Sequence, residues 1–345
     1  SGNTIDSNTV SNSQYYSGFS FDSRSHNNII TNNVANNNGQ YGFYFGVDST
    51  GHTFTGNTAT GNAIADFQGT GPPSGTVSTS GITLNANDGG DCSTVGTWDS
   101  STKTCTLTAD ISMTSDGIGI HIPYISYDGV PDVGIILDGD GHTITGTGTS
   151  GIDHDGVRVT GQSWHVTIKD LIIKDFKNGI NSSYTDGLTV SGVTVDSVGT
   201  AMHIEGNPSI VTPTKITGNT VKNSDSGIRL FDIQTGWVQE DGTFNIEVGC
   251  IGVGHILSNI VQNIGNTGIG LSNSDGTCVR DNTIEDSTNS IAVTNTSHSV
   301  LVQNNVITNS ESAALYLQGA ERIVIRDNTI TGDGEYGGFI RDEGN

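Results

Sequence analysis

Four short lines between residues 255 and 330 decide the fold of this chain: HILSNIVQN (255–263), CVRDNTIED (278–286), VLVQNNVITN (300–309) and IVIRDNTITG (323–332). Aligned on Asn259, Asn282, Asn305 and Asn328, they repeat at equal steps of 23 residues. An apolar residue stands three positions before each Asn, and another stands two positions after it. A fixed period of this size is typical of stacked supersecondary units, each too small to bury a core alone.

The apolar residues alternate over short distances, and clusters of Asn, Asp, Gly and Ser interrupt them. This pattern predicts short strands and turns rather than helices. One period of about 22–26 residues then makes one circuit of strands that pairs in parallel with the next circuit. We expect Asn at the corner in the left-handed conformation, with its side-chain amide in a ladder along the stack. The fold class is therefore all-β, a right-handed parallel β-helix.

These lines resemble the parallel β-helix repeats of pectate-lyase-like proteins and of NosD-like prokaryotic surface and periplasmic proteins. The resemblance covers most of the chain and implies a fold rather than a chemistry. The family includes polysaccharide lyases, hydrolases and epimerases together with non-enzymatic adhesins and fibre proteins, so the fold does not decide the function.

The charge of the chain restricts the classes of partner that it can bind. Its 345 residues include 13 Lys and Arg against 36 Asp and Glu, a formal net charge of −23. Such a surface disfavours nucleic acid and anionic membranes, and it attracts divalent cations weakly at many places. The sequence has no run of 18 apolar residues, so it predicts no transmembrane helix.

The four cysteines, Cys92, Cys105, Cys250 and Cys278, form no CxxC motif and favour disulfides in an oxidising, extracytoplasmic compartment. Cys92 with Cys105 would close a hairpin, and Cys250 with Cys278 would join neighbouring coils. The chain begins at Ser1 without a signal sequence, which indicates a processed product or a fragment of a secreted protein.

Sequons at Asn181 and Asn295 are candidate glycosylation sites.

The repeat also organises the rest of the chain. Residues 1–68 already lie in coils, aligned on Asn8, Asn33 and Asn57. Residues 69–80, with two prolines, are expected to be a linker, and 81–112 a cap-like segment with the disulfide hairpin. Residues 113–345 form the main β-helix. Its ladder position is taken successively by His142, Leu171, Val193 and Asn219, and an insertion at 231–254 carries Trp237.

The two ends of the chain match one another. Counting from Asn328 through residue 345 and on from residue 1, Asn8 follows after 25 residues, which is also the step from Asn8 to Asn33. The turn EYGGF (335–339) resembles YYSGF (15–19), so that Tyr336 aligns with Tyr16 and Phe339 with Phe19. Either the chain is one period of a tandem array, or subunits stack end to end; the third reading is coincidence in an Asn- and Gly-rich repeat.

The segment GIDHDGVR (151–158) is the candidate for chemistry. Asp153, His154, Asp155 and Arg158 are the residue types with which a uronan lyase or epimerase neutralises a carboxylate and removes a proton. The segment distantly resembles the Asp-x-His motif of alginate epimerases, although His154 falls one residue early. The alternative is an exposed polar strand edge.

Two further groups of residues are candidate sites. Asp138 and Asp140, with Asp132 nearby, are a weak candidate for Ca²⁺, although the chain has no EF-hand loop. Phe19, Phe21, Phe43 and Phe45 are candidates for a sugar-stacking platform, unless strand alternation places them in the core.

We therefore predict a non-enzymatic, structural, extracellular β-solenoid that assembles head to tail into a cell-surface fibre. It needs no cofactor except, at most, Ca²⁺. Its partner is another copy of itself, and glycans are further candidate partners. The alternative is a carbohydrate-active or carbohydrate-binding β-helix with its site around residues 153–158. A fibre needs compatible ends, whereas an enzyme acting on uronates needs a basic cleft.

Overall fold

The structure is a computed structural model. It describes residues 2–21, 25, 28–31, 33–46, 53–55, 57–60, 62–68, 76–79, 81–123, 134–150, 154–161, 165–185, 187–207, 213–233, 254–332 and 334–341. The chain divides into two compact units, Ser1–Val77 with Thr108–Asp110, and Ser78–Leu107 with Ile111–Asn345. Strand β10 (Thr76–Thr79) lies at this division. Most of the predicted linker (69–75 and 80) and most of the predicted insertion (234–253, with Trp237) lie outside the described residues.

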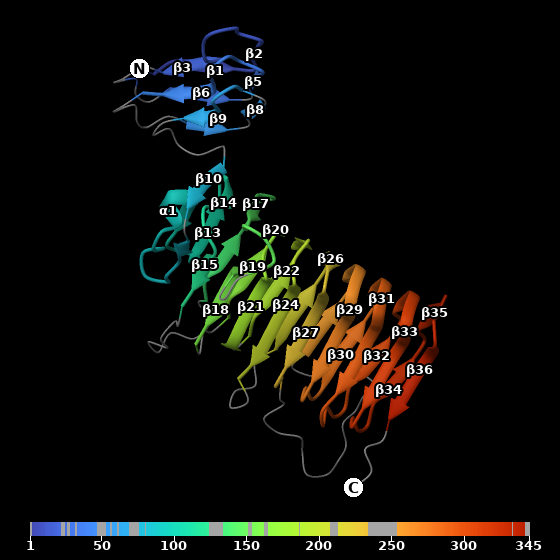
Figure 1. Ribbon diagram of the computed structural model, residues 1–345. Helices are drawn as coiled ribbons and strands as arrows, with labels where there is room; N and C mark the ends of the chain where they lie inside the picture. The colour runs from blue at the N-terminus through green and yellow to red at the C-terminus, as the bar shows by residue number, and fades with distance from the viewer. Residues whose placement is uncertain are drawn as a thin grey trace. The chain divides into compact units, whose positions relative to one another are not determined.

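The smaller unit consists of stacked coils whose strands pair in parallel with those of the next coil (Figure 1). Its three columns are β1 (Thr4–Asp6), β4 (Ile29–Thr31) and β7 (Thr53–Thr55); β2 (Thr9–Ser11), β5 (Val34–Asn36) and β8 (Thr58–Thr60); and β3 (Phe19–Phe21), β6 (Tyr41–Phe45) and β9 (Ala65–Gln68). Ile30 and Ala35 are fully buried between them. Equivalent residues of successive coils thus lie directly above one another.

The phenylalanines of the smaller unit stack inside its core. Phe19 lies over Phe43 with ring centroids 4.9 Å apart, and Phe21 lies over Phe45 at 4.8 Å. Phe43 is fully buried, and Phe19 packs against the same cluster. The sugar-stacking platform considered for these rings is therefore wrong, because strand alternation turns both rings of each coil inward.

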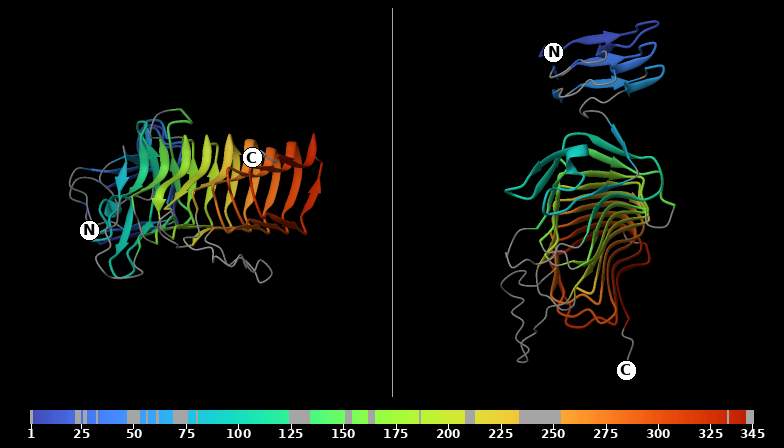
Figure 2. Two further views of the ribbon diagram at one scale, coloured as in Figure 1. Left: turned by 90° about the horizontal axis from the view of Figure 1, so that it is seen from below. Right: turned by 90° about the vertical axis from the view of Figure 1, so that its left-hand side faces the viewer.

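The larger unit is a right-handed parallel β-solenoid, in which the coils stack with their strands aligned (Figure 2). Two of its three columns join through long strands that continue around a corner: β29 (Ile260–Ser272), β31 (Thr283–Thr294) and β33 (Val306–Gln318). The interior rows are almost entirely Ile, Val and Leu. Each such side chain contributes about 1.5–3 kcal/mol on full burial, so the stack stabilises coils that could not fold alone.

The remaining strands fall into the three columns of the larger unit. The first column contains β14 (Asp110–Met113), β17 (Thr143–Thr145), β20 (Ile172–Lys174), β23 (Thr194–Asp196), β26 (Thr220–Ser224) and, beyond the long strands, β35 (Thr329–Thr331). The second contains β11 (Ile82–Thr83), β15 (Ile118–Ile122), β18 (Asp155–Thr160), β21 (Asn178–Thr185), β24 (Thr200–Gly206), β27 (Ser226–Phe231) and, beyond the long strands, β36 (Tyr336–Arg341). The third contains β12 (Gly96–Asp99), β13 (Thr104–Leu107), β16 (Ile136–Asp138), β19 (Thr167–Lys169), β22 (Thr189–Ser191), β25 (Thr214–Thr217), β28 (Gly254–Leu257), β30 (Thr277–Arg280), β32 (Leu301–Gln303) and β34 (Val324–Arg326).

The predicted asparagine ladder is present. The side-chain nitrogen of each ladder Asn donates to the side-chain oxygen of the Asn in the next coil, at 2.9–3.0 Å, from Asn219 through Asn259, Asn282 and Asn305 to Asn328. The main-chain N–H of the same residue donates to the same oxygen. The ladder confirms the sequence alignment, including the step of 40 residues between Asn219 and Asn259.

One expectation about the ladder is wrong. The left-handed conformation does not fall on the ladder Asn but on the residue before it, as at Ser258 (φ 56°), Asp281 (φ 58°) and Asn304 (φ 54°). The ladder Asn keeps its amide in the dry interior of the stack, with Asn282 only 1% exposed. The tight bend is displaced by one position because the ladder residue has to aim its amide along the stack.

Apolar residues replace Asn in the earlier coils. Leu171 and Val193 occupy the ladder column and are buried. Their carbonyls accept from Thr194 N–H at 2.8 Å and Thr220 N–H at 2.9 Å, in the same pattern as the ladder Asn. The main-chain pairing therefore continues where the side-chain ladder stops.

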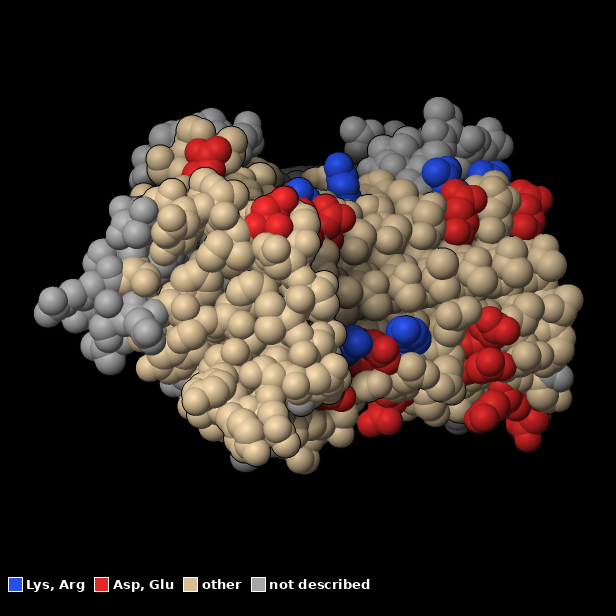
Figure 3. Space-filling view, turned by 90° about the horizontal axis from the view of Figure 1, so that it is seen from above, with Lys and Arg blue, Asp and Glu red and all other residues tan. Residues whose placement is uncertain are grey.

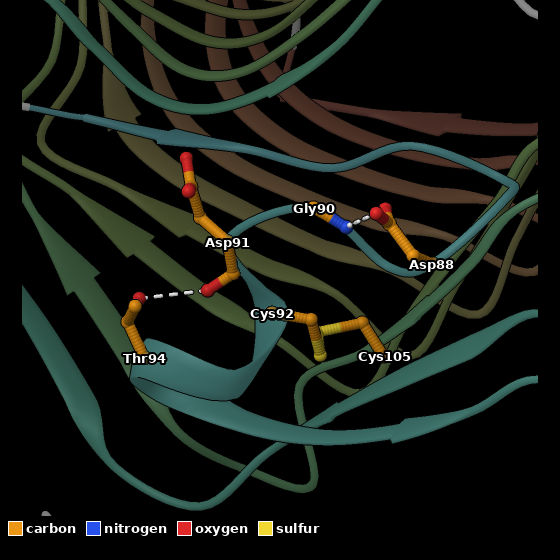
Figure 4. Close-up of a disulfide and its surroundings, with 6 residues drawn as sticks. All are labelled: Asp88, Gly90, Asp91, Cys92, Thr94 and Cys105. Atoms are coloured by element: carbon orange, nitrogen blue, oxygen red, sulfur yellow. Dashed lines mark hydrogen bonds between the residues drawn. A yellow bond between two sulfur atoms is a disulfide. The ribbon is translucent and has the colours of Figure 1, made fainter.

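A disulfide joins the short helix α1 (Cys92–Val95) to β13. The Cys92–Cys105 bond predicted from the sequence is present, and both cysteines are fully buried (Figure 4). β12 and β13 form an antiparallel hairpin at the first edge of the third column. Cys278 is also disulfide-bonded, while Cys250, its predicted partner, lies outside the described residues.

Candidate functional site

Polar and aromatic side chains form one row along the outer face of the second column. We call it the central row: His121, Arg158, Asn181, His203, Arg229, Gly270, Ala292, Tyr316 and Phe339, which are in register from β15 to β36. From His121 to Tyr316, the residues on either side of each, such as Val157 and Val159, are buried. Since side chains alternate along a strand, the central row faces outward.

Asp155 anchors the start of the central row. Its side chain is fully buried and accepts hydrogen bonds from Arg158 Nε at 2.5 Å, Asn178 Nδ2 at 2.7 Å and Asn181 Nδ2 at 2.9 Å. A buried carboxylate needs such donors to remain charged. All three donors come from this coil or the next, so the cluster ties two coils together and occupies the oxygens that a catalytic base would need.

His154 does not join this cluster. Its ring is fully buried and lies against Phe176, with ring centroids 4.8 Å apart. Nε2 lies 3.4 Å from Thr147 N, and Nδ1 is buried without a hydrogen-bond partner. Among the described residues, no hydrogen bond links His154 to Asp155 or Arg158, and Asp153 lies outside the described residues. Of the four predicted catalytic residues, the structure brings together only Asp155 and Arg158.

The two histidines of the central row are held neutral. Burial lowers the pKa of His203, and the nearby charge of Arg229 lowers it further. Burial also lowers the pKa of His121, together with the charge of Arg158. His121 Nε2 lies 2.9 Å from Thr160 Oγ1. At neutral pH the row therefore takes its positive charge from Arg158 and Arg229.

The central row is interrupted by two small residues, Gly270 and Ala292, which lie between Arg229 and Tyr316. The space left by their missing side chains is a hollow of about 170 Å³. It is lined by Arg229, Phe231, Thr267, Gly270, Leu271, Ser272, Asn289, Ala292, Thr294 and Tyr316. We call it the central hollow. Its residues come from four coils, so no single stretch of sequence indicates it.

The predicted calcium ligands are committed to other partners. Asp138 Oδ2 forms an ion pair with Lys169 Nζ, which raises the pKa of Lys169, and Asp138 Oδ1 accepts from Asp140 N–H at 3.1 Å. Asp140 is exposed, and Asp132 lies outside the described residues. On the face shown in Figure 3, acidic side chains are spread along the margins rather than gathered at one point. The expectation of a calcium site at Asp138 and Asp140 is therefore not supported, because a lysine neutralises the central carboxylate.

The two sequons lie in different surroundings. Asn181 is half-buried and its amide is bonded to Asp155, so a glycan at this position would have to break that bond. Asn295 is exposed at a turn, with its amide 3.0 Å from Ser272 Oγ. Glycosylation stays a prediction, and Asn295 is the more accessible acceptor.

The aromatic residues predicted to meet at the ends are placed differently. Tyr16 and Tyr336 are exposed, at 73% and 48%. Phe339 stacks on Tyr316 of the central row at 5.3 Å and faces outward, whereas Phe19 faces the core of the smaller unit. Aligning Phe339 with Phe19 is therefore wrong by one residue, and a slip of one residue changes the face of a strand.

Comparison with known proteins gives two family matches. Residues 214–345 match the family described as right handed beta helix region, and residues 68–245 match the family described as periplasmic copper-binding protein (NosD). No curated protein matches the chain, and no solved structure does. No helix in the described part of the chain is long and apolar enough to cross a membrane.

The described residues do not fit a copper ion. Copper is held by His, Cys or Met side chains that converge. Met113 and Met202 are buried in the core, and Cys92, Cys105 and Cys278 are in disulfides. His121 and His203 are three coils apart in the central row, about 14 Å at the spacing of paired strands. Within the described ranges, no three His, Cys, Asp or Glu residues are arranged to hold a metal.

The second match covers more than half of the chain, and the solenoid accounts for both matches. The chain belongs to the family of periplasmic copper-binding protein (NosD), as a right-handed parallel β-helix repeat protein.

Proposed function

We propose that this chain is a structural, non-enzymatic repeat of a cell-surface fibre, in which the last coil of one copy of the chain stacks on the first coil of the next copy. The family match and the solenoid support a periplasmic or extracellular β-solenoid. Stacking between units would extend the same pairing that joins coils within each unit. It applies equally to separate molecules and to units joined in one longer chain.

The polarity of the asparagine ladder carries this proposal. Each ladder Asn donates its main-chain N–H to the side-chain oxygen of the next coil, as Asn305 does to Asn328. Among the described residues, the main-chain N–H of Asn328 has no acceptor. Asn8 donates to Asn33 in the same way, but its own side-chain oxygen accepts from no described donor. The last coil thus offers the main-chain N–H of Asn328 as a donor, and the first coil offers the side-chain oxygen of Asn8 as its acceptor.

The apolar rows are also open at the last coil. Ile340 is in register with buried Leu317, so it faces the interior, yet it is 76% exposed. Ile325 continues the row of buried Val302 and is 39% exposed. At the other end, Ile5 and Val10 are only half-buried. A covering coil would bury these side chains, each worth up to about 1.5–3 kcal/mol.

The aromatic register at this junction differs from the one expected. Since Phe339 faces outward and Phe19 faces inward, Ile340 is the residue that would meet the inward ring of Phe21. If Asn328 stacks on Asn8 and Ile340 on Phe21, the register between the two coils must shift by one residue between the ladder and this strand. Such shifts already occur between coils of this solenoid, for example between Ser287 and Asn289. The ladder and the interior rows can therefore continue together.

A non-enzymatic role agrees with the state of the candidate catalytic residues. The carboxylate of Asp155 is buried and accepts three hydrogen bonds, and the ring of His154 packs into the core. Neither side chain is free to remove a proton from a sugar. The absence of lyase and epimerase activity on uronans, with and without Ca²⁺, is the expected result of a direct assay.

Electron microscopy of the purified protein at neutral pH, with and without Ca²⁺, tests the assembly. We expect unbranched filaments whose axial repeat equals one unit. The variant Ile340→Lys places a charge on the open interior row and should abolish them. Ile260→Lys is the matched control, because Ile260 is 43% exposed on the side of the solenoid. Short monodisperse rods of the unmodified protein, or filaments that survive Ile340→Lys, would contradict the proposal.

A further inference from the structure

The central hollow lies on the outer side of the solenoid and is not explained by stacking of the end coils. Outward residues at this position are large in the neighbouring coils: His203 and Arg229 on one side, Tyr316 and Phe339 on the other. Gly270 and Ala292 interrupt them over two coils, about 10 Å at the spacing of paired strands. The hollow therefore arises because two successive positions of the central row, in neighbouring coils, carry small residues between large ones.

An arginine without an acidic partner forms one wall. Arg229 has no ion pair among the described residues, although the chain carries a formal net charge of −23. Its guanidinium lies 5.0 Å from the ring centroid of Phe231, and that ring lies 4.7 Å from the ring of His203. Stacking fixes the plane of the guanidinium and leaves its N–H fork to bind a carboxylate in two-point fashion.

The other walls offer hydrogen-bonding groups and a second aromatic ring. Thr267 and Asn289 lie on one side of the central row, and Ser272 and Thr294 on the other. The side-chain oxygen of Asn289 is buried without a hydrogen-bond donor. Buried polar atoms are rarely left unpaired, and a turn of this side chain into the hollow would offer the oxygen to a ligand hydroxyl. Tyr316 closes the far end with its ring.

We propose that the central hollow binds a carboxylated sugar unit, with the carboxylate on Arg229, a ring hydroxyl on Asn289 and an apolar face of the ring against Tyr316. The volume of about 170 Å³ is below that of a pocket for a drug-sized ligand and suits one ring. The site binds and does not cleave. It extends the proposed structural role by giving the solenoid a side-on contact with an acidic glycan.

The ligand's carboxylate and hydroxyls are each required. A neutral sugar would leave Arg229 without a counter-charge, and a carboxylate without hydroxyls would leave Asn289 unpaired. A single ring of this size binds with a Kd of about 1 mM. Ligand-observed NMR titration suits this range. The probes are D-glucuronate and D-galacturonate, with glucose, galactose and benzoate as comparisons.

Two variants and one control test the assignment. Arg229→Gln should weaken uronate binding at least about tenfold, since it removes a charge-assisted pair. Gly270→Leu should abolish binding by filling the hollow. A Cβ at Gly270 would lie 3.4 Å from Thr267 Cγ2 and 3.8 Å from Arg229 Cγ, which are ordinary contacts. Arg280→Gln is the matched control, because Arg280 pairs with Asp281 outside the hollow.

Uronate binding that exceeds binding of the neutral sugars and of benzoate, and that is lost in Arg229→Gln but kept in Arg280→Gln, supports the proposal. No uronate binding, equal binding of glucose, or equal loss in both arginine variants overturns it. If Gly270→Leu does not melt cooperatively, Arg229→Gln decides alone. None of these variants touches the end coils, so failure of this binding leaves filament formation unaffected, and the reverse also holds.

Discussion

Replacing Asn282 by alanine tests whether the asparagine ladder stabilises the stack. Asn282 is 1% exposed. Its side-chain nitrogen donates to Ile256 O at 2.9 Å and to Asn305 Oδ1 at 3.0 Å. Its side-chain oxygen accepts from the main-chain N–H and the side-chain nitrogen of Asn259, both at 2.9 Å. Asn282→Ala removes all four bonds and leaves the fold of the main chain unchanged.

The expected cost follows from the groups left behind. The main-chain N–H of Asn259 loses its acceptor in a dry interior, whereas the carbonyl of Ile256 stays in the parallel pairing of β28 with β30. A buried polar group without a partner costs about 1–3 kcal/mol, which is the expected loss of unfolding free energy. Leu171 and Val193 occupy the same column without a polar side chain, and they do not contradict this estimate. They lie in adjacent coils, so neither of them stands between two ladder asparagines.

Urea denaturation followed by far-UV circular dichroism measures the change in unfolding free energy. Asn266→Ala is the control, because Asn266 is exposed in the same strand as Ile264, and it should change stability by less than about 0.5 kcal/mol. Coils contact only their neighbours, so unfolding can begin locally. Hydrogen exchange at the Asn259 amide reports on this coil alone and should accelerate about 100-fold. A loss below about 1 kcal/mol, with unchanged protection of Asn259, would refute the reasoning.

Three further outcomes are expected. Cys92→Ser with Cys105→Ser opens a loop of 13 residues and should lower the unfolding free energy by about 3 kcal/mol, measured by urea denaturation against the unmodified, disulfide-bonded protein. Gly156→Ala should cost about 1–3 kcal/mol and lower the melting temperature, because its Cβ would lie 2.4 Å from Ile173 Cγ2; an unchanged melting temperature would show that the coils have slack. Burial holds the pKa of His203 below its ordinary value of 6.5, so the unfolded chain binds the proton first and stability falls as pH drops below about 6.5 towards the lowered value. The melting temperature should therefore fall between pH 7.5 and pH 5 by less in His203→Gln than in the unmodified protein, and an equal fall in both would exclude this contribution.

The stack of coils was predictable because its signal is local and repeated. The apolar residues around each Asn fix the strands of one coil, and equal spacing places each coil on the last. The ladder even aligned Asn219 with Asn259 across an insertion, as their side-chain bond confirms. The disulfide between Cys92 and Cys105 was predictable from their short separation. Each of these features depends on residues close in sequence or on an exact repeat.

The candidate binding site was not predictable in the same way. Arg229 stands ten residues after its ladder Asn, Gly270 eleven, Ala292 ten and Tyr316 eleven. Those differences of one residue arise where the chain shifts register between coils, and each shift changes which side chain faces outward. Spacing alone therefore cannot tell which residues share the central row.

The sequence by itself determined the solenoid, its interior rows and its ladder, because these follow from a repeating pattern of apolar residues and asparagine. Tertiary structure alone decided that Lys169 neutralises Asp138, that His154 turns away from Asp155, and that Arg229 is left beside an empty space. The physical reason is that outward side chains meet across coils. Their contacts depend on register shifts of single residues. The interior packing tolerates those shifts, so the repeating pattern of apolar residues does not reveal them.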